Sequence, residues 1–241
     1  MYGKLRFSFA VQELLGGRAM RRWIFQWAVT ALLTGGVNVG ALSQEKAPSL
    51  PETHAEALLA AMGGREAWST VAFVHVEAVH DDLDISEPFV NRIWNDLSEP
   101  RVRFSAENGR FKHARWIASG AGARETETAA SIPLTPAQYE ADFAWWEANV
   151  YRTLHRIAKR DPTLRFRTVG ASRLEIVRPD GTLLNWFVLN QKGEPMLFGA
   201  GGDSGGTAFG PLGASGDVRY PKWGARADGS WRYEILRFEA S

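Results

Sequence analysis

The chain has 241 residues, of which 45% are hydrophobic, and it includes ten tryptophans and thirteen phenylalanines. This is enough apolar material for one domain with a sizeable core. It contains no cysteine, which excludes disulfides, thiolate metal sites and cysteine nucleophiles. Without its first 43 residues the chain has 23 basic and 26 acidic side chains, a net charge of −3, so we expect no nucleic-acid partner.

Residues 1–43 have the pattern of an export signal. A positive Met-Arg-Arg triplet at 20–22 precedes an apolar segment at 23–33, which is short for a membrane span. Ala-Leu-Ser at 41–43 fits a signal-peptidase site, with an uncleaved membrane anchor as the alternative. We therefore expect a periplasmic or secreted protein, cleaved near Ser43, with no integral membrane span in its mature form.

The same pattern makes Met20 an alternative start of translation. Residues 44–51 are predicted to be a polar linker, and residues 52–241 a single domain. This domain is expected to begin with a short helix over 52–62, because its apolar residues recur on one side and Gly63-Gly64 provides a helix stop. A further helical turn at 65–68 precedes the first strand.

The longest predicted helix runs from Thr135 to Arg160. Thr135, Pro136 and Gln138 have the chemistry of a helix start, and apolar residues then recur every three or four positions. Short segments rich in β-branched and aromatic residues flank this helix and predict strands. These segments are 71–79, 89–96, 101–106, 110–118, 164–169, 173–177, 183–189, 194–198, 217–220 and 231–238. The glycine-rich stretch 198–216 is expected to be a loop with weak structure.

Short turns between successive strands favour an antiparallel sheet, such as Glu107-Asn108-Gly109. Strand 183–189 is apolar on both faces, as expected of a sheet covered on both sides or of a curved sheet lining an apolar cavity. We predict an α+β fold in which a curved antiparallel half-barrel has the long central helix and the short N-terminal helix packed on it.

Three short sequence segments resemble those of lipoprotein-carrier-like (LolA/LolB-like) periplasmic proteins, in particular of exported members. Residues 60–68 (AAMGGREAW) are similar to the end of their N-terminal helix, and residues 91–103 to their second strand pair. Residues 146–170, with WEANVY, DPTLRF and a later glycine, are similar to the segment between helix and strand. The resemblance covers about residues 52–200 and contains no catalytic motif. It implies a half-barrel that carries acyl chains or lipid-like ligands in an apolar cavity closed by helices.

A cavity of this kind needs large apolar side chains in its wall and polar groups at its rim, where arginine can pair with phosphate or carboxylate. The alternatives are core packing for the tryptophans and surface solvation for the arginines. The candidate ligand-binding residues are Trp94, Trp116, Trp145, Trp146, Val150, Trp186, Arg152 and Arg156. We predict non-enzymatic binding or carriage of a lipid or other apolar ligand, without a cofactor, with another envelope protein as a further partner.

A serine hydrolase is the main alternative function, because residues 202–206 read Gly-Asp-Ser-Gly-Gly around Ser204. A chymotrypsin-like enzyme also needs a histidine base and an orienting aspartate upstream. His80 and Asp96 are the nearest candidates, but they are closer in sequence than that fold places them. A third alternative is an interaction module with a filled core and an exposed apolar patch.

His75, His80 and three aspartates at 81, 82 and 84 could supply metal ligands. The two histidines are five residues apart, so on a strand they face opposite sides. The aspartates are simply explained by a hairpin loop. We therefore predict no metal site.

Overall fold

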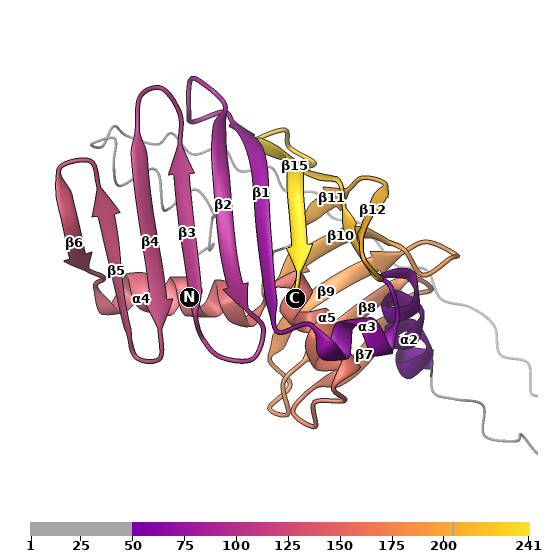
Figure 1. Cartoon of the computed structure of the whole chain (residues 1–241). Coiled ribbons are helices and arrows are strands. Elements are labelled where there is room, and N and C mark those ends of the chain that lie inside the picture. The colour runs from indigo at the N-terminus through magenta and orange to yellow at the C-terminus, as the bar shows by residue number, and fades with distance from the viewer. Residues whose placement is uncertain (1–49, 204) are drawn as a thin grey trace, which may run out of the picture. The chain divides into compact units, whose positions relative to one another are not determined.

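The computed structural model describes residues 50–203 and 205–241 (Figure 1). Its helices are α2 (Leu50–Ala61), α3 (Arg65–Thr70), α4 (Pro136–Glu147) and α5 (Val150–Ala158). Its strands are β1 (Phe73–Asp82), β2 (Phe89–Asp96), β3 (Val102–Glu107), β4 (Lys112–Ala118), β5 (Ala121–Thr126), β6 (Ala129–Pro133), β7 (Arg165–Val169), β8 (Arg173–Val177), β9 (Leu183–Leu189), β10 (Pro195–Ala200), β11 (Thr207–Phe209), β12 (Leu212–Ser215), β13 (Val218–Pro221), β14 (Trp223–Arg226) and β15 (Trp231–Ala240). The predicted signal segment and Ser204 lie outside the described residues.

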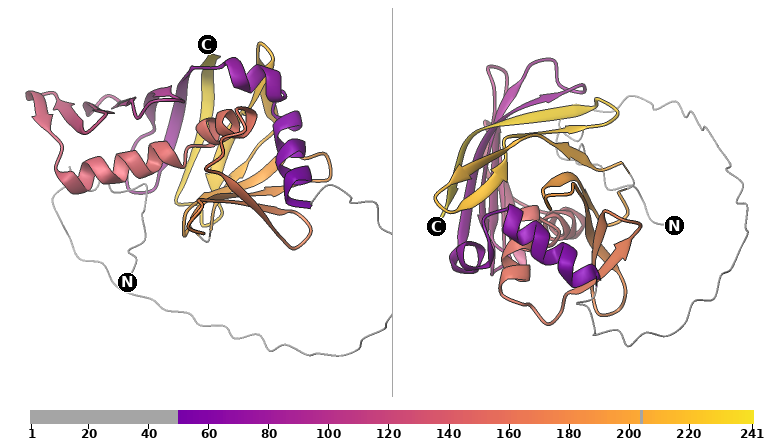
Figure 2. Two further views of the ribbon diagram at one scale, coloured as in Figure 1. Left: turned by 90° about the horizontal axis from the view of Figure 1, so that it is seen from below. Right: turned by 90° about the vertical axis from the view of Figure 1, so that its right-hand side faces the viewer.

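A single antiparallel sheet of 13 strands organises the described part of the chain, in the order β6-β5-β4-β3-β2-β1-β15-β14-β11-β10-β9-β8-β7. The two end strands do not pair with each other, so the sheet is open. Helix α4 runs along one face of β1–β6, and the strands from β14 to β7 turn round α5 (Figure 2). The predicted α+β class with a curved antiparallel sheet is thus confirmed.

Strand β1 defines the two faces of this sheet. Val74, Val76 and Ala78 are buried against the helices, and we call their side the inner face. Alternation along a strand places His75 and Glu77 on the opposite, outer face. Register then carries this assignment to the neighbouring strands, because directly paired residues lie on the same face.

The larger core cluster fills the space between the second half of the sheet and helices α2, α3 and α5. Trp68, Leu154 and Phe187 are completely buried in it. Trp68 also donates its indole N–H to the carbonyl of Met62 at 2.7 Å, which ties α3 to the end of α2. Gly63 lies between these helices at φ 117°, a conformation open to glycine, and a Cβ there would lie 2.3 Å from the carbonyl oxygen of Asp217.

The predicted long helix is two helices, which is a correction to the sequence analysis. The capping box at its start is confirmed, with Thr135 and Gln138 bonding each other's backbone N–H. The helix ends at Glu147, however, and Asn149 begins a second one. The Asn149 side chain accepts hydrogen bonds from the backbone N–H of Tyr151 at 3.0 Å and of Arg152 at 3.3 Å. Asparagine is a strong N-cap, so the break has a local cause.

The glycine-rich stretch 198–216 is not a weakly structured loop, since it contributes the end of β10, β11 and β12. The sequence analysis also missed β5, β6 and β14. Glycine occurs here because aromatic rings lie against the backbone. A Cβ at Gly199 would come within 2.3 Å of the Trp186 ring, and one at Gly210 within 2.2 Å of the Trp223 ring. The glycines therefore accommodate packed aromatic rings, Gly199 within β10 and Gly210 between β11 and β12.

Candidate functional site

The junction of α4 and α5 brings together an indole and two arginines. Trp146, at the end of α4, is 3% exposed and donates its indole N–H to the carbonyl of Asp96 at 2.7 Å. The guanidinium carbon of Arg152 lies 3.8 Å from the centroid of the Trp146 ring, a cation–π contact. Arg156 follows one turn later on α5, on the same side of the helix as Arg152.

Arg152 holds a positive charge that no carboxylate of the described residues meets with a hydrogen bond, although Glu147, Asp161 and Asp96 lie near enough to favour the charge. Its Nε and Nη1 atoms are buried and have no hydrogen-bond partner among the described residues. Desolvation lowers the pKa of Arg152 from 12.5 to about 10, and the charge of Arg156 acts in the same direction. Buried N–H groups normally have an acceptor, and a guanidinium is shaped to bind a carboxylate or phosphate through two of them. This arrangement is suited to an anion.

Arg156 differs from Arg152 because it has its own carboxylate. Its Nε donates to Oδ2 of Asp161 at 2.7 Å, and its Nη2 donates to the hydroxyl of Thr163 at 2.9 Å. Burial would raise the pKa of Asp161, but the hydrogen bonds from Thr163 and Arg156 outweigh it and lower this pKa to about 2. Only Nη1 of Arg156 remains buried without a partner among the described residues. Asp161 thus neutralises Arg156 and leaves Arg152 as the anion-binding candidate.

A buried asparagine on the neighbouring strand adds further unsatisfied polar atoms. Asn95 is 2% exposed, and neither its side-chain nitrogen nor its oxygen has a partner among the described residues. It lies on the inner face of β2, opposite Val74 and Val102. Val102 belongs to the same apolar cluster as Trp146, so Asn95 and the arginine pair border one region of the interior.

A row of aromatic side chains crosses the inner face at the far ends of the same strands. Its ring centroids are 5.8 Å apart for Phe111 and Phe89, 5.3 Å for Phe89 and His80, 5.5 Å for His80 and Tyr233, and 5.5 Å for Tyr233 and Trp231. Burial lowers the pKa of His80 to about 4, so its imidazole is neutral at pH 7. The row is therefore an uncharged aromatic surface.

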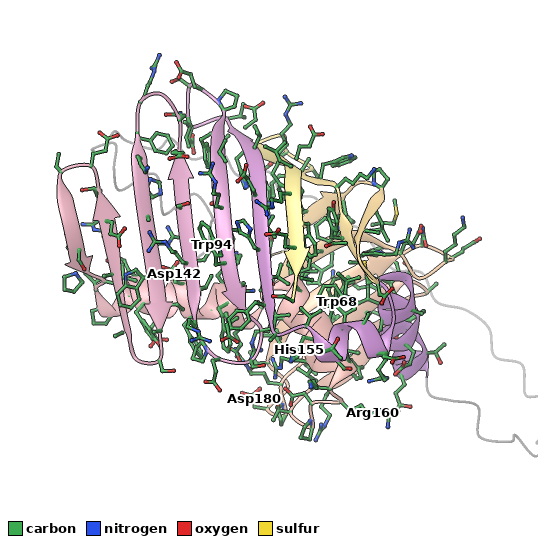
Figure 3. The ribbon with its side chains drawn as sticks, in the orientation of Figure 1. Trp68, Trp94, Asp142, His155, Arg160 and Asp180 are labelled. Carbon is green, nitrogen blue, oxygen red and sulfur yellow. The ribbon has the colours of Figure 1, made fainter. Side chains whose placement is uncertain are left out.

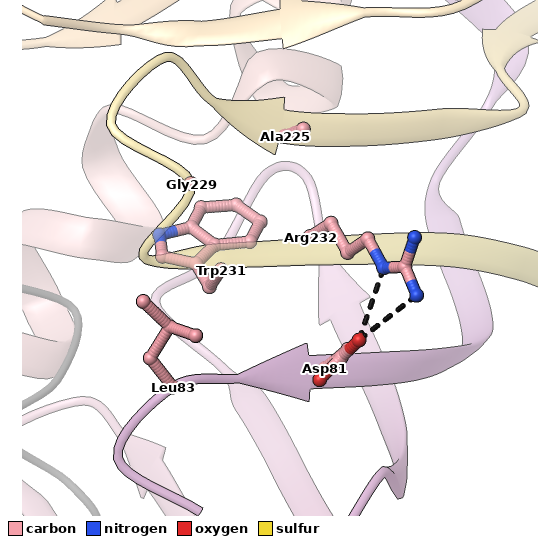
Figure 4. A pocket seen from close by; sticks show the side chains of 6 residues that line it. All are labelled: Asp81, Leu83, Ala225, Gly229, Trp231 and Arg232. Atoms are coloured by element: carbon pink, nitrogen blue, oxygen red, sulfur yellow. Dashed lines mark hydrogen bonds and ion pairs between the residues drawn. The ribbon is translucent and has the colours of Figure 1, made fainter.

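A small hollow of about 290 Å³ lies at the Trp231 end of this row (Figure 4). Leu83, Ala225 and Gly229 line it together with Trp231. Arg232 and Asp81 form an ion pair at its side, with a nitrogen–oxygen distance of 2.9 Å. The hollow has one apolar wall and one charged wall.

The structure brings five of the eight predicted ligand-binding residues together. Trp145, Trp146, Val150, Arg152 and Arg156 all lie at the α4–α5 junction. Trp145 packs edge-on against Phe104, with ring centroids 4.7 Å apart, and Val150 packs on the larger core cluster.

The other three residues lie elsewhere in the fold. Trp94 and Trp116 lie on the outer face, because Trp94 pairs with His75 and Trp116 pairs with Arg103. Trp186 is 3% exposed on β9, where Arg173 covers its ring at 4.2 Å. Its indole N–H bonds the carbonyl of Asp203 at 2.9 Å, so Trp186 is a packing residue.

Sequence reasoning missed Asn95 and the aromatic row around His80. The alternation of side chains along a strand could have identified the row, since His80, Phe89 and Tyr233 occupy positions on their strands whose side chains point to the inner face. Nothing local distinguishes Asn95 from an exposed asparagine, because its burial depends on strands and helices distant in sequence.

The alternative sites are only partly described. Ser204 lies outside the described residues, while its neighbour Asp203 forms an ion pair with Arg226 at 2.5 Å. His80 and Asp96 lie at opposite ends of the β1–β2 pair, so they do not form a catalytic pair. No group of three or more metal-ligating side chains occurs within residues 50–203 and 205–241.

Neither a protein-family model nor a curated protein sequence matches this chain. A solved DUF1329 family protein from Desulfovibrio piger is similar over 79% of this chain and 93% of its own, with 8% identity and a TM-score of 0.41. An uncharacterized conserved protein from Thermus thermophilus is similar over 73% of this chain and 83% of its own, with 10% identity and a TM-score of 0.33. Among the described helices, none has the length and apolar character needed to cross a membrane.

Proposed function

We propose that the protein binds an amphipathic ligand with an anionic head, such as a fatty acid or an acidic lipid, and that it carries this ligand without catalysing a reaction. The observation that supports the proposal is that the buried Nε and Nη1 atoms of Arg152 have no hydrogen-bond partner among the described residues. An anionic head would supply the missing acceptors, and the Trp146 ring would hold the guanidinium in place.

The apolar part of such a ligand would lie along the inner face of β2, where it would replace the contacts that Ile93 makes with the smaller core cluster around Trp146. Asn95, Ile93, Asn91 and Phe89 point to this face in succession along β2. The six residue steps from Phe89 to Asn95 span about 20 Å, which is comparable with an extended long-chain acyl group. The head would lie near Arg152 and the tail end near the aromatic row.

A periplasmic or secreted location and a lipoprotein-carrier-like family form part of this proposal. Its support is the export pattern of residues 1–43 and the three sequence segments of the resemblance. An open, curved antiparallel sheet with helices on its inner face is the architecture that such a carrier requires.

Palmitate binding, measured by native mass spectrometry and by calorimetry on the purified protein, tests the proposal. Hydrogen bonds to a charged group contribute about 1.5–3 kcal/mol, so we expect Arg152→Met to weaken palmitate binding by at least tenfold. Lys159→Met is the matched control, because it removes an exposed cation from the end of the same helix. It should change the affinity less than twofold.

Binding of hexadecanol distinguishes the contribution of the anionic head from that of the apolar tail. The uncharged alcohol should bind wild type and Arg152→Met with similar affinity, since it has no anion for the guanidinium. The proposal fails if wild type takes up neither palmitate nor lysophosphatidic acid. It also fails if Arg152→Met binds palmitate as tightly as wild type does.

A further inference from the structure

Positive charge is concentrated in one segment of the chain. Residues 150–180 contain eight basic and three acidic side chains, whereas the other residues from 44 onwards contain 15 basic and 23 acidic ones. The segment forms α5, the turn after it, β7, β8 and part of the β8–β9 turn. Such asymmetry in an otherwise acidic domain directs an anionic partner to this part of the molecule.

Pairing with carboxylates neutralises only part of this charge. The ion pairs are those of Arg156 with Asp161, Arg178 with Glu147, and both Arg167 and Arg173 with Glu175. Lys159, Arg160 and Arg165 are exposed and form no ion pair with a described residue. We call these three residues the basic corner.

The basic corner lies where α5 passes into β7. Lys159 is the C-cap of α5, Arg160 follows it with φ 54°, and Arg165 begins β7. Arg165 folds back over the intervening turn, because its Nη1 donates to the carbonyls of Pro162 at 2.6 Å and Leu164 at 2.9 Å. Figure 3 shows Arg160 at the lower margin of the molecule. The three cations therefore lie around a single turn.

The end of helix α5 does not require these cations. Carbonyl groups at a helix C-terminus attract cations, which is a common structural role of basic residues there. At the end of α5 this role belongs to Arg65, whose Nη1 donates to the carbonyls of Ile157 at 2.8 Å and Ala158 at 2.7 Å. The charges of the basic corner thus remain available to an external anion.

The outer side of β7 adds a further cation and an apolar residue to this positive surface. Phe166 packs on the larger core cluster, so alternation along the strand puts Arg165, Arg167 and Val169 on the outer side. Val169 is 46% exposed. Strand β7 is also an end strand of the sheet, so this side of the molecule is an edge.

Three exposed carboxylates on neighbouring elements lie outside the ion pairs. Asp180 is in the β8–β9 turn, and Glu52 and Glu66 are on α2 and α3. These two helices pack on the inner side of the sheet, whereas Arg165 and Arg167 point to the outer side. A flat anionic surface that approaches β7 from the outer side therefore meets the arginines before the two helix carboxylates.

From the unpaired cations of the basic corner, the outward arginines of β7 and the exposed valine beside them, we infer that this edge docks the protein on an anionic lipid bilayer. Anionic headgroups attract exposed lysines and arginines, and an apolar side chain beside them enters the boundary of the acyl region. A bilayer is flat on the scale of this edge, so exposed side chains suffice and no concave pocket is required.

The docked edge would adjoin the proposed anion-binding site. Lys159 follows Arg152 by seven residues of helical chain, which is about 10 Å along the helix axis. An anionic lipid that leaves the bilayer at the basic corner would thus have a short path to Arg152. This last step rests on the proposed function, whereas docking itself does not.

Co-sedimentation of the purified protein with vesicles tests the inference. We expect wild type to bind vesicles of equimolar phosphatidylcholine and phosphatidylglycerol, and to bind pure phosphatidylcholine at least about tenfold more weakly. A cation at an anionic surface strengthens binding by a factor of about five, so the double variant Arg160→Gln, Arg165→Gln should bind the anionic vesicles about 25-fold more weakly. Sodium chloride at about 1 M should remove most of this binding, because it shortens the Debye length to about 3 Å.

Two variants control for net charge and for folding. Lys222→Gln is the matched control for charge, because Lys222 is exposed, forms no ion pair with a described residue and precedes β14, which four strands separate from β7. Arg165→Lys keeps the charge and loses the forked hydrogen bonds to the turn. Both variants should bind the anionic vesicles within about twofold of wild type. All variants share the same N-terminal segment, so differences between them report the basic corner.

Three results would overturn the inference: the double variant binds anionic vesicles as wild type does, Lys222→Gln weakens binding as much as the double variant, or pure phosphatidylcholine is bound as tightly as the anionic mixture. Tighter binding of soluble polyglutamate than of vesicles would assign the corner to an acidic protein instead. The double variant should keep its affinity for soluble palmitate, and an equal loss there would place the corner in the ligand site. Arg152→Met should bind vesicles as wild type does, so docking can fail or succeed independently of the lipid proposal.

Discussion

Replacing Arg152 by methionine should make the ligand-free protein more stable. Arg152 carries a charge that burial disfavours, and no acceptor of the described residues compensates for its Nε and Nη1 atoms. Methionine has a similar length, no charge and no hydrogen-bond requirement. It can therefore occupy the space over Trp146 while removing the desolvation cost.

The magnitude follows from the pKa of Arg152, which desolvation lowers from 12.5 to about 10. This corresponds to roughly 3 kcal/mol of unfavourable free energy for the charged form at neutral pH. The cation–π contact with Trp146 returns about 1–2 kcal/mol of it. We therefore expect Arg152→Met to raise the free energy of unfolding by about 1–2 kcal/mol, which for a domain of this size raises Tm by about 2–8 °C.

Urea denaturation at pH 7, followed by tryptophan fluorescence and circular dichroism, measures this difference. Lys159→Met again serves as the control and should change the free energy of unfolding by less than about 0.5 kcal/mol. At the same high palmitate concentration, wild type should gain at least about 1.4 kcal/mol more stability than Arg152→Met, which corresponds to the tenfold difference in affinity. A loss of 1 kcal/mol or more in ligand-free Arg152→Met would show that the guanidinium is a structural group with partners of its own, and would refute the reasoning.

Three further predictions concern stability. The pKa of His80 is lowered to about 4, so between pH 6.5 and 4 the unfolded chain binds a proton that the folded chain does not. Acidification from pH 7 to 4.5 should therefore lower the free energy of unfolding by roughly 2–2.5 kcal/mol in urea titrations, and His80→Phe should abolish this part. The pKa of Asp161 is lowered to about 2, so the stabilising effect of its carboxylate is complete above pH 4 and is lost towards pH 2. Asp161→Asn should therefore lower the free energy of unfolding by roughly 1–2 kcal/mol at pH 7. An unchanged free energy of unfolding would contradict the ion pair with Arg156. Gly199→Ala should lower Tm and alter near-ultraviolet circular dichroism because a Cβ there lies 2.3 Å from the Trp186 ring, whereas Gly202→Ala, with nothing within 4 Å, should not.

Most of the fold followed from local patterns. Strands β2, β8 and β9 begin and end at the predicted residues, and the capping box at Thr135 was recognised from its side chains. The helix break at Asn149 was missed because the apolar stripe continues across it, so periodicity outweighed the capping signal. The glycine-rich strands were missed for another reason. Their glycines are required because aromatic rings from other strands lie against the backbone, and local strand propensity does not reveal such a contact.

The faces of strand β2 show why the candidate site could be predicted only in part. Phe89, Asn91 and Ile93 alternate with Val90, Arg92 and Trp94, so each face has two apolar residues and one polar residue. Hydrophobic alternation therefore cannot determine which face packs against the helices, and Trp94 was assigned to the interior on size alone. The assignment depends on α4, which begins 40 residues after β2 ends and covers the opposite face. The α4–α5 junction was easier to predict. Arg152 and Arg156 follow Trp146 closely in sequence, and their spacing of four residues places both on one side of helix α5.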